Sequence, residues 1–154
     1  MSPEDKLKEL GIELPAPAKP LGIYVPALRT GNLVYLSGML PLKGGTLVCT
    51  GKLGGGQVDI AQGALAARTA AINAIAALKA EIENLEKVKR CVRLSGYVAS
   101  TPDFTDQPKV VNGASELIGA VFGEKGRHTR IAVGVASLPL GSPVELDFIF
   151  EISD

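Results

Sequence analysis

The sequence predicts an α+β protein in which two helices cover one face of a mixed β-sheet. Residues 57–87 carry apolar side chains at spacings of three and four, which is the period of one helix face. Residues 144–152 alternate between apolar and polar side chains, which is the period of a half-buried strand. After a short leading helix the predicted order is β-β-β-α-β-α-β-β, and helices placed between strands in this way form a layer on the sheet.

The N-terminal region predicts a short helix followed by an extended connector. Ser2 supplies a hydroxyl for the N-cap, and Pro3 suits the first helical position. Residues 12–22 contain three prolines, which favour an extended chain. We therefore expect residues 1–19 to form an N-terminal helix and connector, and residues 20–154 to form a single domain.

Short strands and glycine-rich turns follow the connector. We predict strands at residues 24–28 and 33–37, and a third strand at 46–49. Gly38 closes the second strand, and a glycine there permits the close approach of a ligand or another chain. The loop of residues 51–56 looks like a phosphate-binding loop, but it lacks the final Gly-Lys-Ser/Thr. We interpret it as a mobile loop before a helix.

The second half of the chain predicts the rest of the sheet and the helices that cover it. The helix from residue 57 is alanine-rich in its first half, so we expect it to pack closely on a flat surface such as a sheet. We expect this helix to end near residues 85–88. The later elements are a strand at 88–99, a helix at 109–122, a loop containing His128, a strand at 130–136, a turn with two prolines at 138–143, and a strand at 144–152. In the last strand the alternation places Val144, Leu146, Phe148, Phe150 and Ile152 on one face.

Composition and charge exclude several classes of protein. The 154 residues are 46% hydrophobic and 21% charged, which is typical of a globular protein. Basic and acidic residues number 16 each, so no net field attracts nucleic acid or an anionic membrane. No apolar run reaches the roughly 18 residues of a membrane span, and the charged N-terminus is unlike a secretory signal, so we expect a cytoplasmic location.

Self-association is expected, and metal or cofactor sites are not. Cys49 and Cys91 are too few for a disulfide framework or a metal cluster, and we interpret them as reduced, partly buried thiols. We find no dinucleotide or metal fingerprint, so we predict no cofactor and no metal. A positive mean hydropathy and a sheet face that no helix covers indicate association with other copies.

Few residues indicate chemistry on their own. Arg130 opens an apolar strand, and its planar, permanently charged fork suits a carboxylate, although most arginines at strand starts are surface residues. Glu145 and Asp147 share a strand face, where solvated side chains are equally common. His128 lies in a loop, where a histidine is more often a hydrogen-bond partner than a catalytic base. Spacing alone does not bring Arg130 and Glu145 into one site.

Four segments match, in order, the pattern of one known family. They are Tyr24 with Gly31-Asn32, Ser37-Gly38 and Pro41; the helix start at Asp59-Ile60-Ala61-Gln62; Val111-Asn112; and Arg130 with Leu138-Pro139 and Val144-Glu145. Over residues 20–152 the chain resembles the Rid (YjgF-like) family of reactive intermediate deaminases, in a divergent branch often labelled endoribonuclease L-PSP or translation initiation inhibitor. The chain departs from the family at Ala132, where a cysteine is common.

The resemblance implies a fold, an assembly and a reaction. It implies a chorismate-mutase-like fold and a homotrimer with three clefts between subunits. It implies hydrolysis of enamines or imines to 2-oxo acids and ammonia, in which Arg130 binds the carboxylate of a small metabolite and Glu145 positions water. The pocket would be lined by Tyr24, Ser37, Gly38 and Asn112.

Two other functions stay open at this point. The same cleft would suit a module that binds small carboxylate metabolites without turnover. An endoribonuclease or translation inhibitor is the third possibility, and the zero net charge and the lack of a basic, aromatic-rich stripe argue against it.

Overall fold

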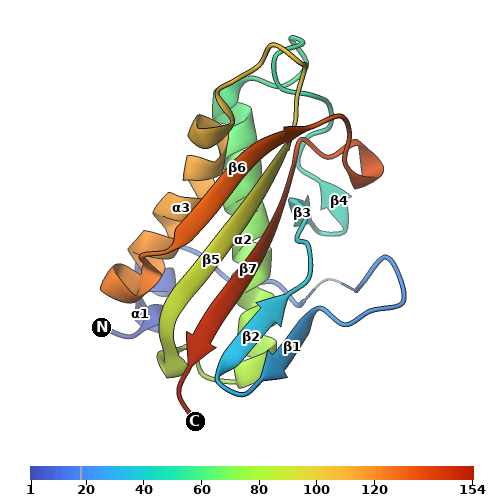
Figure 1. Cartoon of the computed structure of the whole chain (residues 1–154). Helices are drawn as coiled ribbons and strands as arrows, with labels where there is room; N and C mark the ends of the chain where they lie inside the picture. The colour runs from blue at the N-terminus through green and yellow to red at the C-terminus, as the bar shows by residue number, and fades with distance from the viewer. Residues whose placement is uncertain (18) are drawn as a thin grey trace.

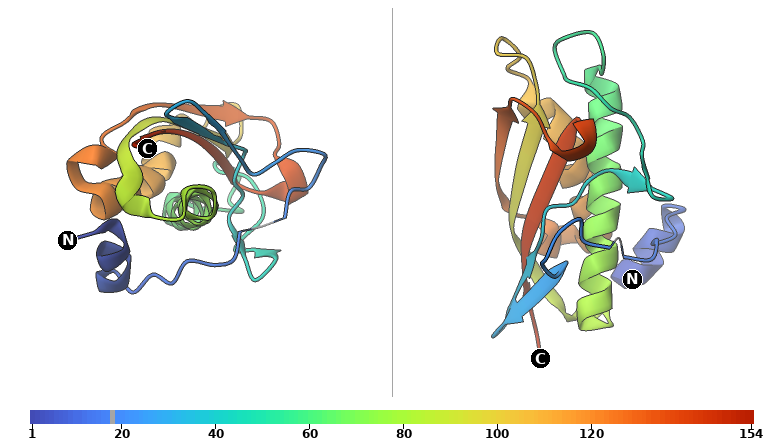
Figure 2. Two further views of the ribbon diagram at one scale, coloured as in Figure 1. Left: turned by 90° about the horizontal axis from the view of Figure 1, so that it is seen from below. Right: turned by 90° about the vertical axis from the view of Figure 1, so that its right-hand side faces the viewer.

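The computed structural model describes residues 1–17 and 19–154 and shows a mixed five-stranded sheet with two helices on one face (Figures 1 and 2). The strand order is β1-β2-β7-β5-β6, and β5 and β6 are parallel whereas the other neighbours are antiparallel. This confirms the predicted α+β class, the mixed sheet and the helix layer. The elements are α1 (Pro3–Glu9), β1 (Ala27–Thr30), β2 (Leu33–Leu36), β3 (Leu42–Lys43), β4 (Thr46–Leu47), α2 (Ile60–Ile82), β5 (Val88–Ala99), α3 (Gln107–Phe122), β6 (Thr129–Val135), β7 (Val144–Ile152), and the 3₁₀ turns η1 (Leu85–Lys87), η2 (Gly123–Gly126) and η3 (Pro139–Gly141).

Strand β7 forms the centre of the sheet, and its alternation is confirmed. Val144, Leu146, Phe148, Phe150 and Ile152 are each at most 1% exposed and face the helices. The residues between them are half-buried on the outer face. The strands β6 and β7 follow one another in the chain but are not neighbours, because β5 lies between them and pairs with both.

Helix α2 runs along the inner face of the sheet, and about half of its residues are buried. Its first half buries Ala66, Ala67, Ala70, Ala71 and Ala74, as the alanine-rich pattern predicted. Small side chains let α3 approach closely: a Cβ on Gly113 would overlap the backbone carbonyl of Ala64. Because a methyl group does not fit there, this crossing needs glycine.

The boundaries of several elements differ from the prediction. Asp59 caps α2, so the helix starts three residues later than expected, and it ends at Ile82 because Glu83 takes a positive φ of 67°. The first strand begins at Ala27, which leaves Tyr24 in an irregular segment before it. The predicted third strand, at residues 46–49, is part of a separate two-stranded ladder of β3 and β4.

The N-terminal helix packs against the helix layer. Leu7 of α1 is 3% exposed and belongs to the main core. The Glu4 carboxylate accepts a hydrogen bond from the backbone N–H of Leu85 at 3.1 Å, which ties α1 to the end of the long helix. A boundary at residue 19 between this helix with its connector and the remaining domain stays a prediction.

The outer face of the sheet is not covered by any of the helices that the structure describes (Figure 2). Leu28, Tyr35 and Ile149 lie side by side across β1, β2 and β7 on this face. Leu28 and Tyr35 are exposed, as is Ile131 on β6. Within residues 1–17 and 19–154, no helix combines the length and hydropathy that a membrane crossing requires.

Candidate functional site

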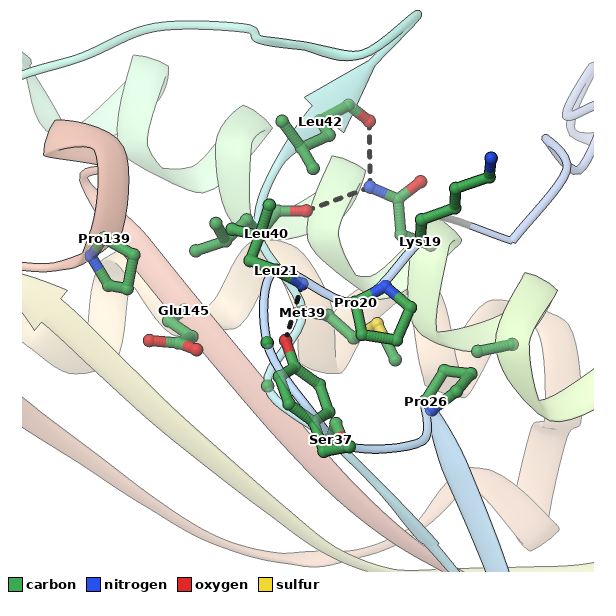
Figure 3. A pocket seen from close by; sticks show the side chains of 15 residues that line it. Lys19, Pro20, Leu21, Pro26, Ser37, Met39, Leu40, Leu42, Pro139 and Glu145 are labelled. Atoms are coloured by element: carbon green, nitrogen blue, oxygen red, sulfur yellow. Dashed lines mark hydrogen bonds between the residues drawn. The ribbon is translucent and has the colours of Figure 1, made fainter.

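A pocket of about 380 Å³ opens between β7 and the connector that precedes β1 (Figure 3). We call residues 19–26 the strap. In Figure 3, Lys19 and Pro20 of the strap lie on one side of the pocket, Glu145 and Pro139 lie on the other, and Leu40 lies between them. The lining residues are Lys19, Pro20, Leu21, Gly22, Tyr24, Pro26, Ser37, Gly38, Met39, Leu40, Leu42, Asn73, Ala77, Pro139 and Glu145.

Hydrogen bonds hold the strap against the end of β2. The Ser37 hydroxyl donates to the carbonyl of Val25 at 2.6 Å, and the backbone N–H of Ser37 donates to Pro26 at 2.9 Å. The Tyr24 hydroxyl accepts from the N–H of Leu21 at 3.2 Å, which closes the strap on itself. The oxygen of Ser37 keeps lone pairs that can accept a hydrogen bond from a ligand.

Asn73 fixes the segment that follows β2. This buried amide on α2 donates to the carbonyls of Leu40 at 2.9 Å and Leu42 at 2.8 Å. On the other side of the segment, Met39 exchanges two backbone hydrogen bonds with Leu146 of β7, at 2.6 and 3.0 Å. These contacts set Gly38 beside the first residues of β7.

Glu145 lies directly against Gly38 with no side chain between them. A Cβ on Gly38 would overlap one carboxylate oxygen of Glu145 and would lie 3.0 Å from its Cδ. Burial raises the pKa of Glu145, and the negative charge of Asp147 raises the pKa further. Among the described residues no side chain forms a hydrogen bond or ion pair with this carboxylate. Its oxygens are therefore available to water or to a ligand.

Arg130 lies on the edge strand β6, away from the pocket, and its side chain is on the helix side of the sheet, whereas that of Glu145 is on the outer face. Arg130 is the second residue of β6 and is in register with Leu94, whose side chain is fully buried on the helix side. Its guanidinium donates to the Ser115 hydroxyl at 3.1 Å and to the carbonyl of Pro108 at 3.3 Å, both on α3. Glu145 is in register with Tyr97, three positions further along β5, so its side chain points to the outer face.

Asn112 belongs with Arg130 rather than with the pocket. It is exposed on α3, four residues after Pro108 and three before Ser115, so the three share one helix face. One chain therefore brings Tyr24, Ser37, Gly38 and Glu145 together around the pocket. It places Asn112 and Arg130 at the far edge of the sheet.

Sequence reasoning missed several residues of both groups. Asn73 carried a usable signal, because it is a polar residue inside the apolar, alanine-rich stripe of α2. Ser115 carried none, since its contact with Arg130 joins the middle of α3 to β6. His128 was interpreted as a hydrogen-bond partner, but its partner Ser115 could not be predicted from the sequence. Lys19 and the other strap residues that line the pocket could not be predicted, because their positions depend on how the connector folds back.

This arrangement defines an α+β protein of the chorismate-mutase-like class, with a pocket beside a carboxylate that has no side-chain partner among the described residues. Residues 4–152 match the family model described as "YjgF/chorismate mutase-like, putative endoribonuclease". The chain belongs to this family, which includes the Rid proteins.

Relatives of this chain cover nearly its whole length. Protein TCP17 of Trypanosoma cruzi is 44% identical over 149 residues, which are 96% of this chain and 92% of that protein. The 2-iminobutanoate/2-iminopropanoate deaminase of Dermatophagoides farinae is 30% identical, over 92% of this chain and 94% of that protein. The crystal structure of Atu1372 from Agrobacterium tumefaciens, a protein of unknown function, has a TM-score of 0.91 and 47% identity, over 98% of this chain and 92% of that chain.

Proposed function

We propose that the protein hydrolyses reactive enamine or imine intermediates to 2-oxo acids and ammonia. The observation that carries the proposal is Glu145, a half-buried carboxylate with a raised pKa that has no partner among the described residues and borders the pocket. A relative that is named as an iminobutanoate and iminopropanoate deaminase supports the choice of reaction.

Glu145 would act as the proton carrier of the hydrolysis. It accepts a proton from water while the water oxygen attacks the imine carbon, and the C=N electron pair moves to nitrogen. Protons from Glu145 and from the new hydroxyl then pass to nitrogen, the C–N bond breaks, and ammonia leaves as the C=O bond forms. The raised pKa makes this carboxylate a stronger base than an ordinary one, and a pKa closer to the working pH suits a group that first accepts a proton and then returns it.

Arg130 would hold the substrate carboxylate through two parallel N–H···O bonds, which fixes the orientation of the imine. The pocket walls favour an apolar group on the other end of the substrate. Met39, Leu40 and Leu42 line it with apolar side chains. We therefore propose imines of amino acids with apolar side chains as substrates, with no cofactor and no metal.

The complete site would lie between two copies of the chain, in a homotrimer with three such clefts. The sheet separates Arg130 from Glu145 within one chain, so one small substrate needs the arginine of a neighbour. A neighbour that brings its α3–β6 edge to the pocket would supply both Asn112 and Arg130. The uncovered sheet face, with exposed Leu28 and Tyr35, supports self-association.

The reaction is tested by ammonia release when an amino-acid oxidase generates imines. We expect wild-type protein to accelerate release, Arg130→Ala to abolish the acceleration, and Glu145→Gln to lower it by about 100-fold or more. Calorimetry with 2-oxobutanoate, a stable carboxylate of product type, separates binding from turnover. Binding that Arg130→Ala removes, without acceleration by the wild type, would instead establish a carboxylate-binding module. RNA cleavage that is retained by Arg130→Ala would point to a nuclease or a contaminant.

Subunit mixing tests the shared cleft. We would co-express Arg130→Ala and Glu145→Ala chains, each inactive alone, and purify the mixed oligomer. Random assembly places an intact arginine opposite an intact glutamate in about a quarter of the clefts of a cyclic oligomer. Activity near that level supports the shared cleft, whereas no recovery in a verified mixed oligomer contradicts it.

A further inference from the structure

Arg130 is the first member of a hydrogen-bonded chain that ends at the only histidine of the sequence. The guanidinium donates to Ser115 Oγ at 3.1 Å, and Ser115 Oγ lies 2.9 Å from Nε2 of His128. On the other side of the ring, Nδ1 of His128 lies 2.7 Å from the carbonyl oxygen of Gly126. All three side chains are partly buried.

The direction of each bond follows from the chemistry of its two ends. The carbonyl of Gly126 only accepts, so Nδ1 of His128 carries a proton. Neutral His128 then presents a bare Nε2, which accepts the Ser115 hydroxyl proton, and the Ser115 oxygen accepts from Arg130. A doubly protonated ring would instead direct two cations at the oxygen of Ser115. The neutral ring with its proton on Nδ1 satisfies all three contacts.

The backbone fixes both ends of this series of hydrogen bonds. Ser115 lies within α3, and Gly126 is a buried residue of the 3₁₀ turn η2 that folds back along the same helix. A Cβ on Gly126 would press on the carbonyl of Ile118 at 2.5 Å, so the turn sits directly on α3. The carbonyl of Pro108 receives the second Arg130 hydrogen bond, at 3.3 Å. The guanidinium is thus anchored at two points on one helix.

We infer that Ser115 and His128 are positioning residues for Arg130, which turn its guanidinium toward the carboxylate of the substrate. The inference rests on the proposed function of Arg130 as a carboxylate clamp. His128 fixes the hydroxyl direction of Ser115, and Ser115 thereby presents its lone pair to Arg130. Neither residue reacts with the substrate. Their loss raises KM and weakens carboxylate binding more than it lowers kcat.

A matched pair of substitutions at His128 isolates the contact with Ser115. In His128→Gln the side-chain oxygen takes the place of Nε2 and still accepts from Ser115. In His128→Asn the side-chain nitrogen takes the place of Nδ1 and still donates to Gly126, but nothing reaches Ser115. We expect His128→Gln to keep a KM close to wild type. We expect His128→Asn and Ser115→Ala to raise KM and the 2-oxobutanoate Kd about tenfold, as for the loss of one ordered hydrogen bond.

A readout independent of turnover is the tautomer of His128. Long-range ¹H–¹⁵N spectra of the wild-type protein should show a protonated Nδ1 and a bare Nε2. In Ser115→Ala the proton should stay on Nδ1, which Gly126 still accepts, while the Nε2 resonance should move because it loses its hydrogen bond. A ring protonated on Nε2 in the neutral form would overturn the inference. So would equal KM values for the Gln and Asn variants, or labelling of Ser115 by a fluorophosphonate, which would make it a nucleophile.

The two proposals fail in different ways. If wild type accelerates imine hydrolysis and Arg130→Ala does not, but Ser115→Ala matches wild type in KM and Kd, the positioning role is wrong and the deaminase stands. If wild type neither turns over imines nor binds 2-oxobutanoate, the deaminase and the clamp both fail, and the positioning role fails with them. The spectra then report only the hydrogen-bonded chain itself.

Discussion

Replacing Gly38 with alanine would place a methyl group where the Glu145 carboxylate now lies. The added Cβ would overlap one carboxylate oxygen and would lie 3.0 Å from Cδ and 3.3 Å from Cγ. The carboxylate must therefore rotate away. Gly38 has no positive φ and is exposed, so the backbone accepts alanine without strain.

The expected effect of Gly38→Ala is a loss of activity without a loss of stability. Moving the far end of a flexible side chain costs little, and replacing glycine stabilises a chain by about 0.4–1 kcal/mol through the unfolded state. The unfolding free energy should thus change by less than about 1 kcal/mol. Displacing a proton-transfer group should lower kcat by about 100-fold or more.

The assay is ammonia release combined with urea unfolding, and a double substitution tests the cause. If Gly38→Ala acts only by displacing Glu145, the double variant with Glu145→Gln should be no slower than Glu145→Gln alone. Gly119→Ala is the matched control, because no atom lies within 4 Å of its added Cβ. Wild-type kcat in Gly38→Ala, or losses that multiply in the double variant, would refute the reasoning.

Three further predictions concern stability and reactivity. Asn73→Ala removes one buried and one partly buried hydrogen bond to the segment after β2 and should lower the unfolding free energy in urea by about 1–3 kcal/mol. An unchanged midpoint would contradict this. Burial raises the pKa of Cys91 to about 12, so at pH 8 a thiol reagent should label the half-buried Cys49 first, and Cys91 only as the protein unfolds; prompt labelling of two thiols in folded protein would contradict this. The pKa of Glu145 is raised in the folded state, so between the ordinary value of 4.5 and the folded pKa the folded protein holds a proton that the unfolded chain has released. The stability of the wild type therefore falls as the pH rises between these two pKa values, and it stays reduced above the folded pKa. Glu145→Gln lacks this carboxyl group, so its unfolding free energy should not show this fall with pH. The unfolding free energy of Glu145→Gln minus that of the wild type should therefore grow from pH 4 to pH 8 in urea titrations. A difference that stays constant would contradict a raised pKa for Glu145.

Local patterns predicted the parts of the fold that depend on neighbouring residues. The alternation of Val144–Ile152 specified the buried face of β7, and the alanine spacing specified the enclosed face of α2. The insertion of β5 between β6 and β7 could not be read in the same way, because a parallel pair joins segments that are far apart in the chain. The end of α2 was missed because Glu83 adopts a backbone conformation that glutamate seldom takes.

The residues of the candidate site were also predicted from the sequence, but their arrangement in space was not. Tyr24, Ser37, Gly38 and Glu145 were proposed from a family pattern, and the structure collects them around one pocket. Whether they act as proposed remains a prediction. The sequence could not show that Arg130 faces the helices while Glu145 faces outward, because that depends on the register of each strand against β5.

The pocket can form only after nearly the whole chain has been synthesised. One wall is the strap, near the start of the chain, and the opposite wall is β7, near its end. During synthesis the strap leaves the ribosome long before β7 exists, so a growing chain has no pocket until the central strand of the sheet is inserted. The same strand closes the core, with Phe148 and Phe150 fully buried. A ligand of this pocket therefore binds only completed, folded chains and adds its binding free energy to the stability of the whole protein.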